Sequence, residues 1–297
     1  MDNSTNKGFF LVGTGRCGTT MFRKLLCFHP DLYVPRETHW IPILYNSFGL
    51  QKIPHAEIFR LLDQVYMAKG RTAIERILKT EGLDENTFRK ALTARLSPSG
   101  EDTIAGFMDA FYSFIAERNG ASLWGDKTPD YGLCMSMLQT IWPDAKFVHI
   151  YRDGRDAAIS MSKVLSFRLL AAWEINHWYA IAYNKQYKQR MSAAMSSLPI
   201  EKFFELWESR LSRILDERNR VKKENYMEIR YEHLLSNPME TLAQVSGFLN
   251  LPEKRNWISE ASATVRSDNI GKNRESRDYI ELTRKYADDL IRLGFQP

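Results

Sequence analysis

The chain has 297 residues, of which 44% are hydrophobic and 26% are charged. These fractions are close to the averages of globular proteins, and they exclude a disordered, a collagen-like or a disulfide-scaffold protein. The 41 Lys and Arg residues outnumber the 36 Asp and Glu residues and give a formal net charge of +5. A surplus of this size suits an anionic ligand, but the basic residues are dispersed along the chain, so we expect no nucleic-acid partner.

The three cysteines, Cys17, Cys27 and Cys134, show no C-x-x-C spacing. We therefore expect reduced thiols, no disulfide framework and no metal site. The apolar run Phe9–Val12 is too short for a signal peptide or a membrane span, and no other stretch approaches the ~18 apolar residues that a span requires. These features predict a cytoplasmic protein with no membrane partner.

The first predicted element is a strand at Gly8–Val12, because a continuous apolar run there is bounded by glycines. A helix is predicted over Thr19–Phe28, where apolar residues recur at helical spacing until His29 and Pro30 stop it. The turn between them reads Gly13-Thr-Gly-Arg-Cys-Gly-Thr-Thr20. Free backbone N–H groups and the helix dipole make such a turn a candidate anion site.

This turn is almost a P-loop. Gly13, Gly18 and Thr20 match the template G-x-x-x-x-G-K-[ST], but Thr19 stands at the lysine position. Without that lysine, magnesium-dependent triphosphate chemistry is disfavoured, and Arg16 offers a cation for a smaller anionic group. The alternative is an ordinary Gly-rich turn, but the flanking strand, the helix and the two hydroxyls favour phosphate binding.

The region from about residue 43 to residue 119 is predicted to be a helical insertion. Apolar residues recur there at intervals of three and four from Ile53 to Asn119, and no strand pattern interrupts them. We expect this insertion to shape a substrate pocket. The stretch Gly125-Asp-Lys-Thr-Pro-Asp-Tyr131 that follows is predicted to be a loop after a short strand.

A second strand is predicted at Lys146–Tyr151 and is followed by a helix. Arg152 begins the turn and Ser160 lies eight residues later, a little over two helical turns, so both side chains could address one oxyanion. A magnesium-dependent P-loop enzyme would place an aspartate at such a strand end. A solvated charge cluster is the alternative, but two phosphate-capable turns in one sheet favour a nucleotide that carries two phosphate groups.

The remaining elements complete an α/β pattern. Further elements are predicted as helices over Leu169–Met195 and Ile200–Lys223, a strand at Tyr226–Arg230, and helices over Pro238–Leu249 and Tyr279–Leu293. Strands that alternate with helices predict a parallel sheet covered on both faces. Because no internal repeat or composition break divides the chain, we predict a single domain over residues 1–297.

These motifs resemble the sulfotransferases that use 3′-phosphoadenosine 5′-phosphosulfate (PAPS). In that family a lysine-less P-loop ending in Gly-Thr-Thr binds the 5′-phosphosulfate, and an Arg with a Ser eight residues later binds the 3′-phosphate. Two further segments, Tyr231-Glu-His-Leu-Leu235 and Ile270-Gly-Lys-Asn-Arg274, are similar to the family's segment near the adenine and to its late basic loop. The resemblance extends from Phe9 to Arg274. It implies a P-loop-like three-layer sandwich, with PAPS as donor and 3′,5′-bisphosphoadenosine (PAP) as product.

The resemblance also implies which residues bind the donor. They are Gly15, Arg16, Cys17, Gly18, Thr19, Thr20, Arg152, Ser160, Tyr231, Lys272 and Arg274. The chain departs from the family pattern at Cys17, where serine is usual, and at Asn273, where many relatives carry tryptophan.

The segment Pro35-Arg-Glu-Thr-His-Trp-Ile-Pro42 is similar to the Glu-Thr segment of tyrosylprotein sulfotransferases, in which the glutamate is the general base. The resemblance therefore implies Glu37 as the base. His39 is the alternative, since histidine is the base in the small-molecule cytosolic branch and imidazole suits proton transfer near neutral pH. A salt bridge of Glu37 with Arg36 or Arg16 is the non-catalytic alternative.

Lys127 lies in a Lys-Thr-Pro stretch that resembles one in the family, where the lysine contacts the sulfuryl group and the bridging oxygen. The resemblance implies that Lys127 stabilises charge on the leaving phosphate. We thus expect metal-free, in-line transfer of a sulfuryl group from PAPS to a hydroxyl or amine of a small-molecule acceptor. A P-loop kinase and a non-catalytic module that binds a bisphosphorylated nucleotide are the alternatives.

Overall fold

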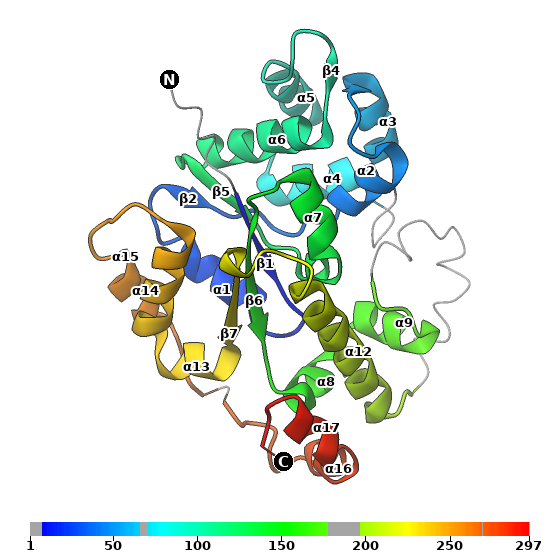
Figure 1. Cartoon of the computed structure of the whole chain (residues 1–297), viewed down its shortest axis with the longest axis vertical. Helices are drawn as coiled ribbons and strands as arrows, with labels where there is room; N and C mark the ends of the chain where they lie inside the picture. Colours follow the sequence, from blue (N-terminus) through cyan, green and yellow to red (C-terminus); the bar gives the residue numbers. More distant parts are fainter. Residues whose placement is uncertain (1–7, 66–70, 178–196, 269, 297) are drawn as a thin grey trace.

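A sheet of five parallel strands forms the centre of the molecule, as the computed structural model shows (Figure 1). The structure describes residues 8–65, 71–177, 197–268 and 270–296. The strand order is β2-β5-β1-β6-β7. The strands are β1 (Phe9–Val12), β2 (Leu32–Tyr33), β5 (Leu123–Asp126), β6 (Lys146–Tyr151) and β7 (Tyr226–Arg230).

Alternate residues of β1 face opposite layers, as the two-residue period of a strand requires. Phe10 packs in one core with Phe147 of β6, whereas Phe9 packs in another core with Val148. All four residues of β1 are buried. The continuous apolar run in the sequence thus reflects a central strand covered on both faces.

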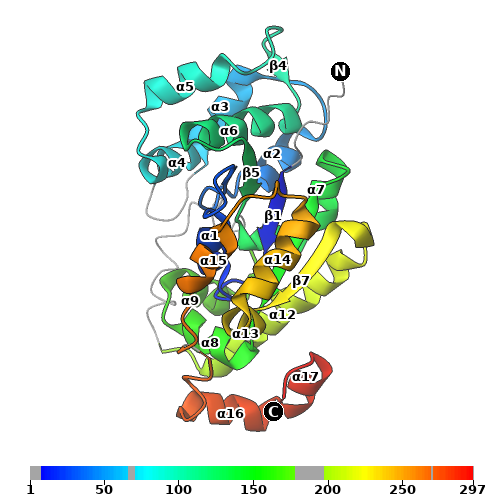
Figure 2. The same ribbon diagram turned by 90° about the vertical axis from the view of Figure 1, so that its left-hand side faces the viewer.

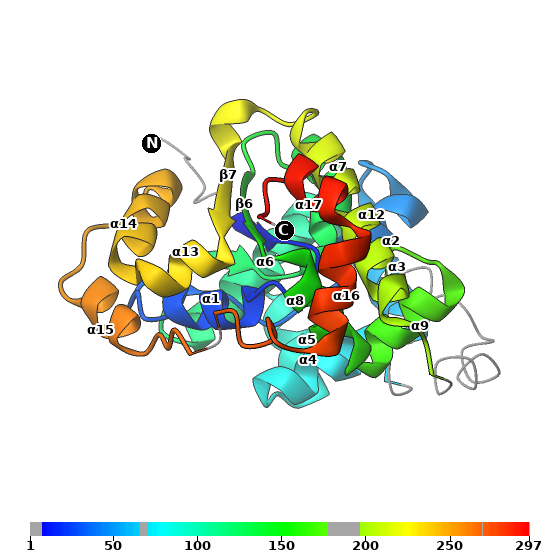
Figure 3. The ribbon, with the colours of Figure 1, turned by 90° about the horizontal axis from the view of Figure 1, so that it is seen from below.

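Helices cover both faces of the sheet, which makes three layers (Figure 3). One face carries α1 (Thr19–Leu26), α13 (Tyr231–Ser236), α14 (Pro238–Leu249) and α15 (Trp257–Ala263). The other carries η2 (Pro129–Cys134), α7 (Met135–Ile141) and α12 (Ile200–Arg218), and the short 3₁₀ helix η3 (Lys223–Asn225) precedes β7. The predicted P-loop-like α/β sandwich with a parallel sheet is confirmed.

A separate hydrophobic core lies at the end of the sheet where the strands finish. It joins α12 to α8 (Gly154–Ser162), α9 (Leu165–Trp173), α16 (Arg277–Lys285) and α17 (Ala287–Arg292). The single helix predicted over Tyr279–Leu293 is wrong, because the backbone leaves the helical region at Tyr286 (φ −119°), whose ring stacks on Phe204 at 4.3 Å. The helix predicted over Leu169–Met195 ends at Trp173 as α9, and residues 178–196 lie outside the described residues.

The predicted insertion forms a helical cap beside β2 and β5 at one end of the molecule (Figures 1 and 2). Its helices are α2 (Ile41–Phe48), α3 (His55–Gln64), α4 (Ala73–Glu81), α5 (Glu85–Thr93) and α6 (Ile104–Arg118). Contrary to the prediction, two strands interrupt it, because β3 (Ile53–Pro54) pairs antiparallel with β4 (Glu101–Asp102). Strands of two residues are too short to show an alternating pattern in the sequence.

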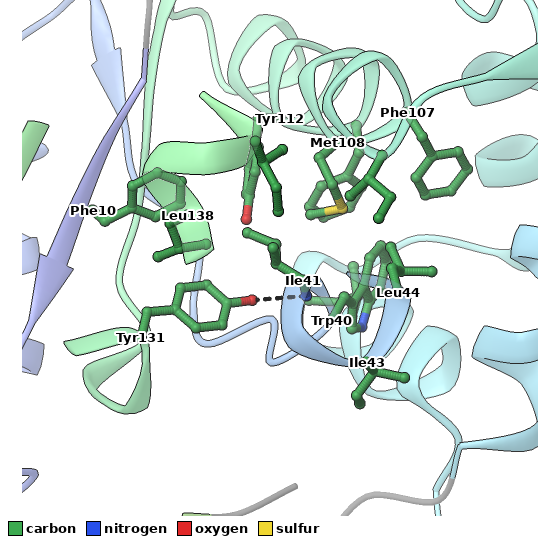
Figure 4. Packing of buried hydrophobic residues seen from close by; sticks show 14 of the residues in the cluster. Phe10, Trp40, Ile41, Ile43, Leu44, Phe107, Met108, Tyr112, Tyr131 and Leu138 are labelled. Carbon is green, nitrogen blue, oxygen red and sulfur yellow. Dashed lines mark hydrogen bonds between the residues drawn. The ribbon is translucent and has the colours of Figure 1, made fainter. Parts of the chain in front are cut away.

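The cap and the sheet share one hydrophobic core (Figure 4). Trp40 and Leu44 at α2 pack with Phe107 of α6, and Phe10 of β1 belongs to the same cluster. Within the described ranges, every helix is too short or too polar to traverse a lipid bilayer.

Candidate active site

The turn between β1 and α1 adopts a conformation that favours glycine. Gly15 and Gly18 have φ values of 85° and 95°, and Arg16 between them has φ 55°. A Cβ atom on Gly18 would lie 2.3 Å from the ring of Tyr231, and one on Gly15 would lie 2.4 Å from the ring of Phe167. Two aromatic rings therefore pack directly against the turn, and its backbone N–H groups lie at the start of α1.

Some residues of this turn line a cavity, and others lie beneath it in the core. Thr19 and Thr20 line a cavity of about 350 Å³, together with Gly15, Arg16 and Gly18. Cys17 is fully buried, and a Cβ atom on Gly13 would lie 2.6 Å from its Sγ. Burial raises the pKa of this thiol. The side chain of Cys17 therefore points away from the cavity, and this residue could contact an anion in the turn through its backbone alone.

The second predicted turn meets the first across this cavity. Arg152 follows β6 and Ser160 lies on α8, and both line the same cavity. Ser160 Oγ accepts a hydrogen bond from Arg16 Nε at 3.0 Å. The cavity opens where β1, β5 and β6 end, which is the usual place for a ligand in an open parallel sheet.

Arg152 is buried yet incompletely paired. Its guanidinium lies 4.8 Å from the centre of the Tyr231 ring and 3.5 Å from the Asp156 carboxylate. Within the described part of the chain, Arg152 Nε is buried and has no hydrogen-bond partner. A buried unpaired donor costs free energy, so this position suits an anionic ligand that would accept from it.

Lys127 links Glu37, the predicted base, to the turn between β1 and α1. This turn is the predicted phosphate site, and we call it the phosphate turn. It follows β5 directly and is 3% exposed. Its Nζ atom lies 2.6 Å from Glu37 Oε1 and 3.4 Å from Thr20 Oγ1. The loop predicted at Gly125–Tyr131 is in fact the end of β5 followed by η2, which fixes Lys127 between two regular elements.

The other carboxylate oxygen of Glu37 faces an arginine and a histidine. Glu37 Oε2 lies 3.2 Å from a terminal nitrogen of Arg76 and 3.6 Å from His39 Nε2. The salt bridge considered from the sequence thus exists, but with Lys127 and Arg76 instead of Arg36 or Arg16. Burial raises the pKa of Glu37, but the nearby His39 and the charge of Lys127 outweigh it and hold the pKa well below its usual value.

A buried hydrogen-bond network holds the segment that carries Glu37 and His39. Thr38 Oγ1 donates to Asp126 Oδ2 at 2.9 Å, and Tyr112 donates to the same oxygen at 2.8 Å. Tyr131 OH lies 2.7 Å from Thr38 Oγ1 and accepts from the Ile41 N–H (Figure 4). His39 itself is 4% exposed with φ 60°, a strained value for a residue other than glycine.

One fully buried arginine on α12 anchors the walls of the cavity. Arg210 Nε donates to the Thr14 carbonyl of the phosphate turn at 2.6 Å. The same guanidinium donates to the Asp130 carboxylate, which lines the cavity, and to the Asn176 carbonyl. Residues from distant parts of the sequence thus hold the phosphate turn in place.

The late basic loop lies beside the second turn. Asn273 Nδ2 donates to Asp156 Oδ1 near the start of α8. The Arg274 N–H donates to the Gly271 carbonyl, and a Cβ atom on Gly271 would lie 2.8 Å from Arg274 Nε. Neither Lys272 nor Arg274 is among the described residues that line the cavity.

Sequence reasoning missed four residues of the site: Arg76, Asp130, Phe167 and Arg210. Asp130 lies in the segment Gly125–Tyr131, whose resemblance to the family points only to Lys127. The other three lie on helices with no local motif, and only tertiary packing brings them to the cavity. Within the described residues, no group of three His, Cys, Asp or Glu side chains could hold a metal ion.

Comparisons with known proteins identify relatives of this chain. A family model described as "Sulfotransferase family" matches residues 8–255. Nodulation protein NoeE of Sinorhizobium fredii is 28% identical over 152 residues, which are 51% of this chain and 30% of that protein. Protein-tyrosine sulfotransferase 1 of Danio rerio is 23% identical over 251 residues, which are 82% of this chain and 53% of that protein. The chain thus spans about half or less of the length of these curated relatives.

A solved structure shares the fold. The sulfotransferase domain from the curacin biosynthetic pathway superposes with a TM-score of 0.59 at 17% sequence identity. The alignment covers 98% of this chain and 99% of that domain. The overall fold is therefore one that another protein also adopts.

Proposed function

The chain belongs to the sulfotransferase family, and we propose that it transfers a sulfuryl group from PAPS to a hydroxyl or amine of a small-molecule acceptor. The observation that carries this proposal is the position of Lys127 Nζ, 2.6 Å from Glu37 Oε1 and 3.4 Å from Thr20 Oγ1. One cation thus lies between a candidate base and a candidate phosphate site. A cation in this position can stabilise the charge that develops on the leaving oxygen during an in-line transfer.

The residues of the cavity fit a donor with phosphate groups at two positions. The glycine turn at the start of α1, with Arg16, Thr19 and Thr20, would hold the 5′-phosphosulfate. Arg152 and Ser160 would hold the 3′-phosphate, and the buried unpaired Arg152 Nε supports this role. Tyr231 lies beside both turns and would contact the nucleoside. Lys272 and Arg274 would act only if their loop approached the bound donor.

PAPS would supply the sulfuryl group. Residues of this chain would accept the proton of the acceptor and stabilise the charge on the leaving oxygen. In the proposed step the acceptor oxygen bonds to sulfur, and the bond from sulfur to the bridging phosphate oxygen breaks with its electron pair left on that oxygen. Glu37 accepts the acceptor's proton, and Lys127 stabilises the new charge on the phosphate oxygen. As Lys127 turns toward that oxygen it leaves Glu37, and the loss of this positive neighbour raises the basicity of the carboxylate.

The acceptor must reach a partly enclosed carboxylate. The Glu37 side chain is 31% exposed, and the neighbouring His39 is buried. A carboxylate that is partly enclosed favours a small alcohol, phenol or amine as acceptor. A peptide tyrosine is the second candidate, because one relative is a protein-tyrosine sulfotransferase.

Labelled sulfate donor offered to small alcohols, phenols, amines and a tyrosine peptide tests the proposal, with products identified by mass spectrometry. We expect Glu37→Gln to lose on the order of 10²–10⁴ in turnover, because shape is kept while proton acceptance is lost. We expect Lys127→Met to lose roughly 10²–10³, through lost charge stabilisation. Acidic phenols that need no base should partly rescue Glu37→Gln alone.

Two outcomes would contradict this assignment of roles. If both variants respond alike to acceptor acidity, Glu37 is a salt-bridge residue. If His39→Ala is the variant that acidic phenols rescue, His39 is the base.

Magnesium-dependent turnover of ATP in place of sulfuryl transfer would favour a kinase, and PAP binding without any transfer would favour a non-catalytic module.

A further inference from the structure

The two oxygens of the Glu37 carboxylate have different partners. Oε1 accepts from Lys127 at 2.6 Å, and Oε2 accepts from Arg76 at 3.2 Å. His39 Nε2 also faces Oε2, but at 3.6 Å it is too far for a hydrogen bond that orients the oxygen. Arg76 is therefore the group that fixes the second oxygen.

We propose that Arg76 is a positioning residue, which holds Glu37 by Oε2 so that Oε1 stays directed at the reacting atoms. This inference rests on the proposed function. The helical cap would then supply part of the catalytic machinery as well as the wall of a pocket.

The helix that carries Arg76 is held in place by a cap at its start and by packing on one face. Thr72 and Glu75 form a complete capping box at the start of α4, with hydrogen bonds of 3.2 and 2.7 Å. Ala73, Ile74, Ile77 and Leu78 bury one face of the helix in the core. The Arg76 carbonyl also accepts from Thr80 Oγ1 at 2.8 Å. The start of the Arg76 side chain is therefore fixed by packing.

Lys127 has two proposed roles, because it holds Glu37 and also stabilises the leaving oxygen. Glu37 therefore needs a second cation to keep its orientation. With Lys127 as its sole orienting partner, the carboxylate would be free to rotate once Lys127 turned toward the leaving oxygen. A base that is misplaced by about 1 Å can cost 10²-fold in rate. Arg76 contacts the opposite oxygen and stays in place while Lys127 moves, so the carboxylate keeps its direction. An ordinary exposed ion pair would have no such effect, but the Arg76 side chain is only 30% exposed and the Glu37 side chain only 31%.

Arg76→Gln and Arg76→Lys test this inference, with Lys79→Gln as a matched control on the exposed side of the same helix. We expect Arg76→Gln to lower kcat by on the order of 10–10² with an unchanged KM for PAPS and unchanged thermal stabilisation by PAP. Arg76→Lys should restore part of the loss, and Lys79→Gln should match the wild type. In a Glu37→Gln background, Arg76→Gln should cost no further turnover, because its effect passes through Glu37.

The outcomes separate this inference from the proposed function. A wild type that transfers no sulfuryl group to any acceptor would refute the proposed function. An active wild type with additive losses in the Glu37→Gln/Arg76→Gln double variant, or with weaker PAP stabilisation in Arg76→Gln, would refute the positioning role alone. Equal losses in Lys79→Gln and Arg76→Gln would show a general effect on α4.

Discussion

At the scale of single residues, Arg152 and Ser160 are the groups that would distinguish one nucleotide from another. They line the cavity on the side of α8, away from the base. We expect PAP to raise the melting temperature of the wild type far more than AMP does, because only PAP fills both phosphate positions. Arg152→Ala or Ser160→Ala should abolish most of this difference, since these side chains would meet only the 3′-phosphate.

Thermal unfolding with PAP and AMP measures this discrimination directly. Ser162→Ala is a suitable control, because Ser162 lies on the same helix and its hydroxyl donates to the Ile159 carbonyl. Unchanged discrimination in both Arg152→Ala and Ser160→Ala would place the 3′-phosphate elsewhere.

Residues within local motifs could be predicted from the sequence, and residues that reach the site through packing could not. Glu37 and Lys127 each stand in a short recognisable segment, and the structure brings them to 2.6 Å. Arg76 lies 39 residues from Glu37 on a helix with no motif. Its contact depends on how the cap packs against the sheet, which local spacing does not encode.

At the scale of one element, α6 carries a half-buried carboxyl that lowers the free energy of unfolding at neutral pH. Asp109 accepts from Trp142 Nε1 at 3.1 Å, and burial raises its pKa to about 6 despite this hydrogen bond. Between about pH 4 and pH 6 the folded state binds more protons than the unfolded state, so the free energy of unfolding falls as pH rises. We expect Asp109→Asn to be more stable than the wild type at pH 7, on the order of 1–2 kcal/mol.

Denaturant unfolding at several pH values checks this expectation. The difference between Asp109→Asn and the wild type should vanish below about pH 3, where the carboxyl is protonated in both the folded and the unfolded state. Glu117→Gln is the control, because Glu117 lies on the same helix with its side chain 56% exposed. A stability difference that does not vary with pH would contradict the assigned cause.

Long elements with a clear period were predictable, and short ones were not. The strands β6 and β7 match the predicted ranges and β1 begins one residue later than predicted, because each strand places at least three apolar residues between turn signals. The strand β2 has two residues, and the sequence offers no pattern of that length. Where Tyr286 separates α16 from α17, the apolar period continues across the break, so only tertiary stacking reveals it.

At the scale of the whole molecule, Arg210 joins parts that are far apart in the chain. Its guanidinium is fully buried and is paired with Asp130 while it also holds the Thr14 carbonyl. Removing one partner of a buried ion pair leaves a charge without compensation, which costs about 3–5 kcal/mol. We expect Arg210→Met to lose stability of this size and to weaken stabilisation by PAP, because the phosphate turn loses its anchor.

The double variant Arg210→Met/Asp130→Asn separates these two effects. It should recover much of the stability, since no buried charge is left unpaired, but not the response to PAP. Chemical denaturation and thermal shift with PAP measure the two quantities. Full recovery of the thermal stabilisation by PAP would show that the phosphate turn does not depend on the contact between Arg210 and the Thr14 carbonyl.

The strand order carries a consequence for how the chain comes to be folded. The first strand, β1, lies in the middle of the sheet, and its partners β5 and β6 begin more than a hundred residues later, with Phe9 opposite Gly125 and Lys146. During synthesis the most apolar strand therefore leaves the ribosome long before either neighbour exists. Pairings this distant in sequence slow folding and prolong exposure of apolar surface. The helical cap is synthesised after β2 and before β5, so its length determines how long β1 remains without its partner strands.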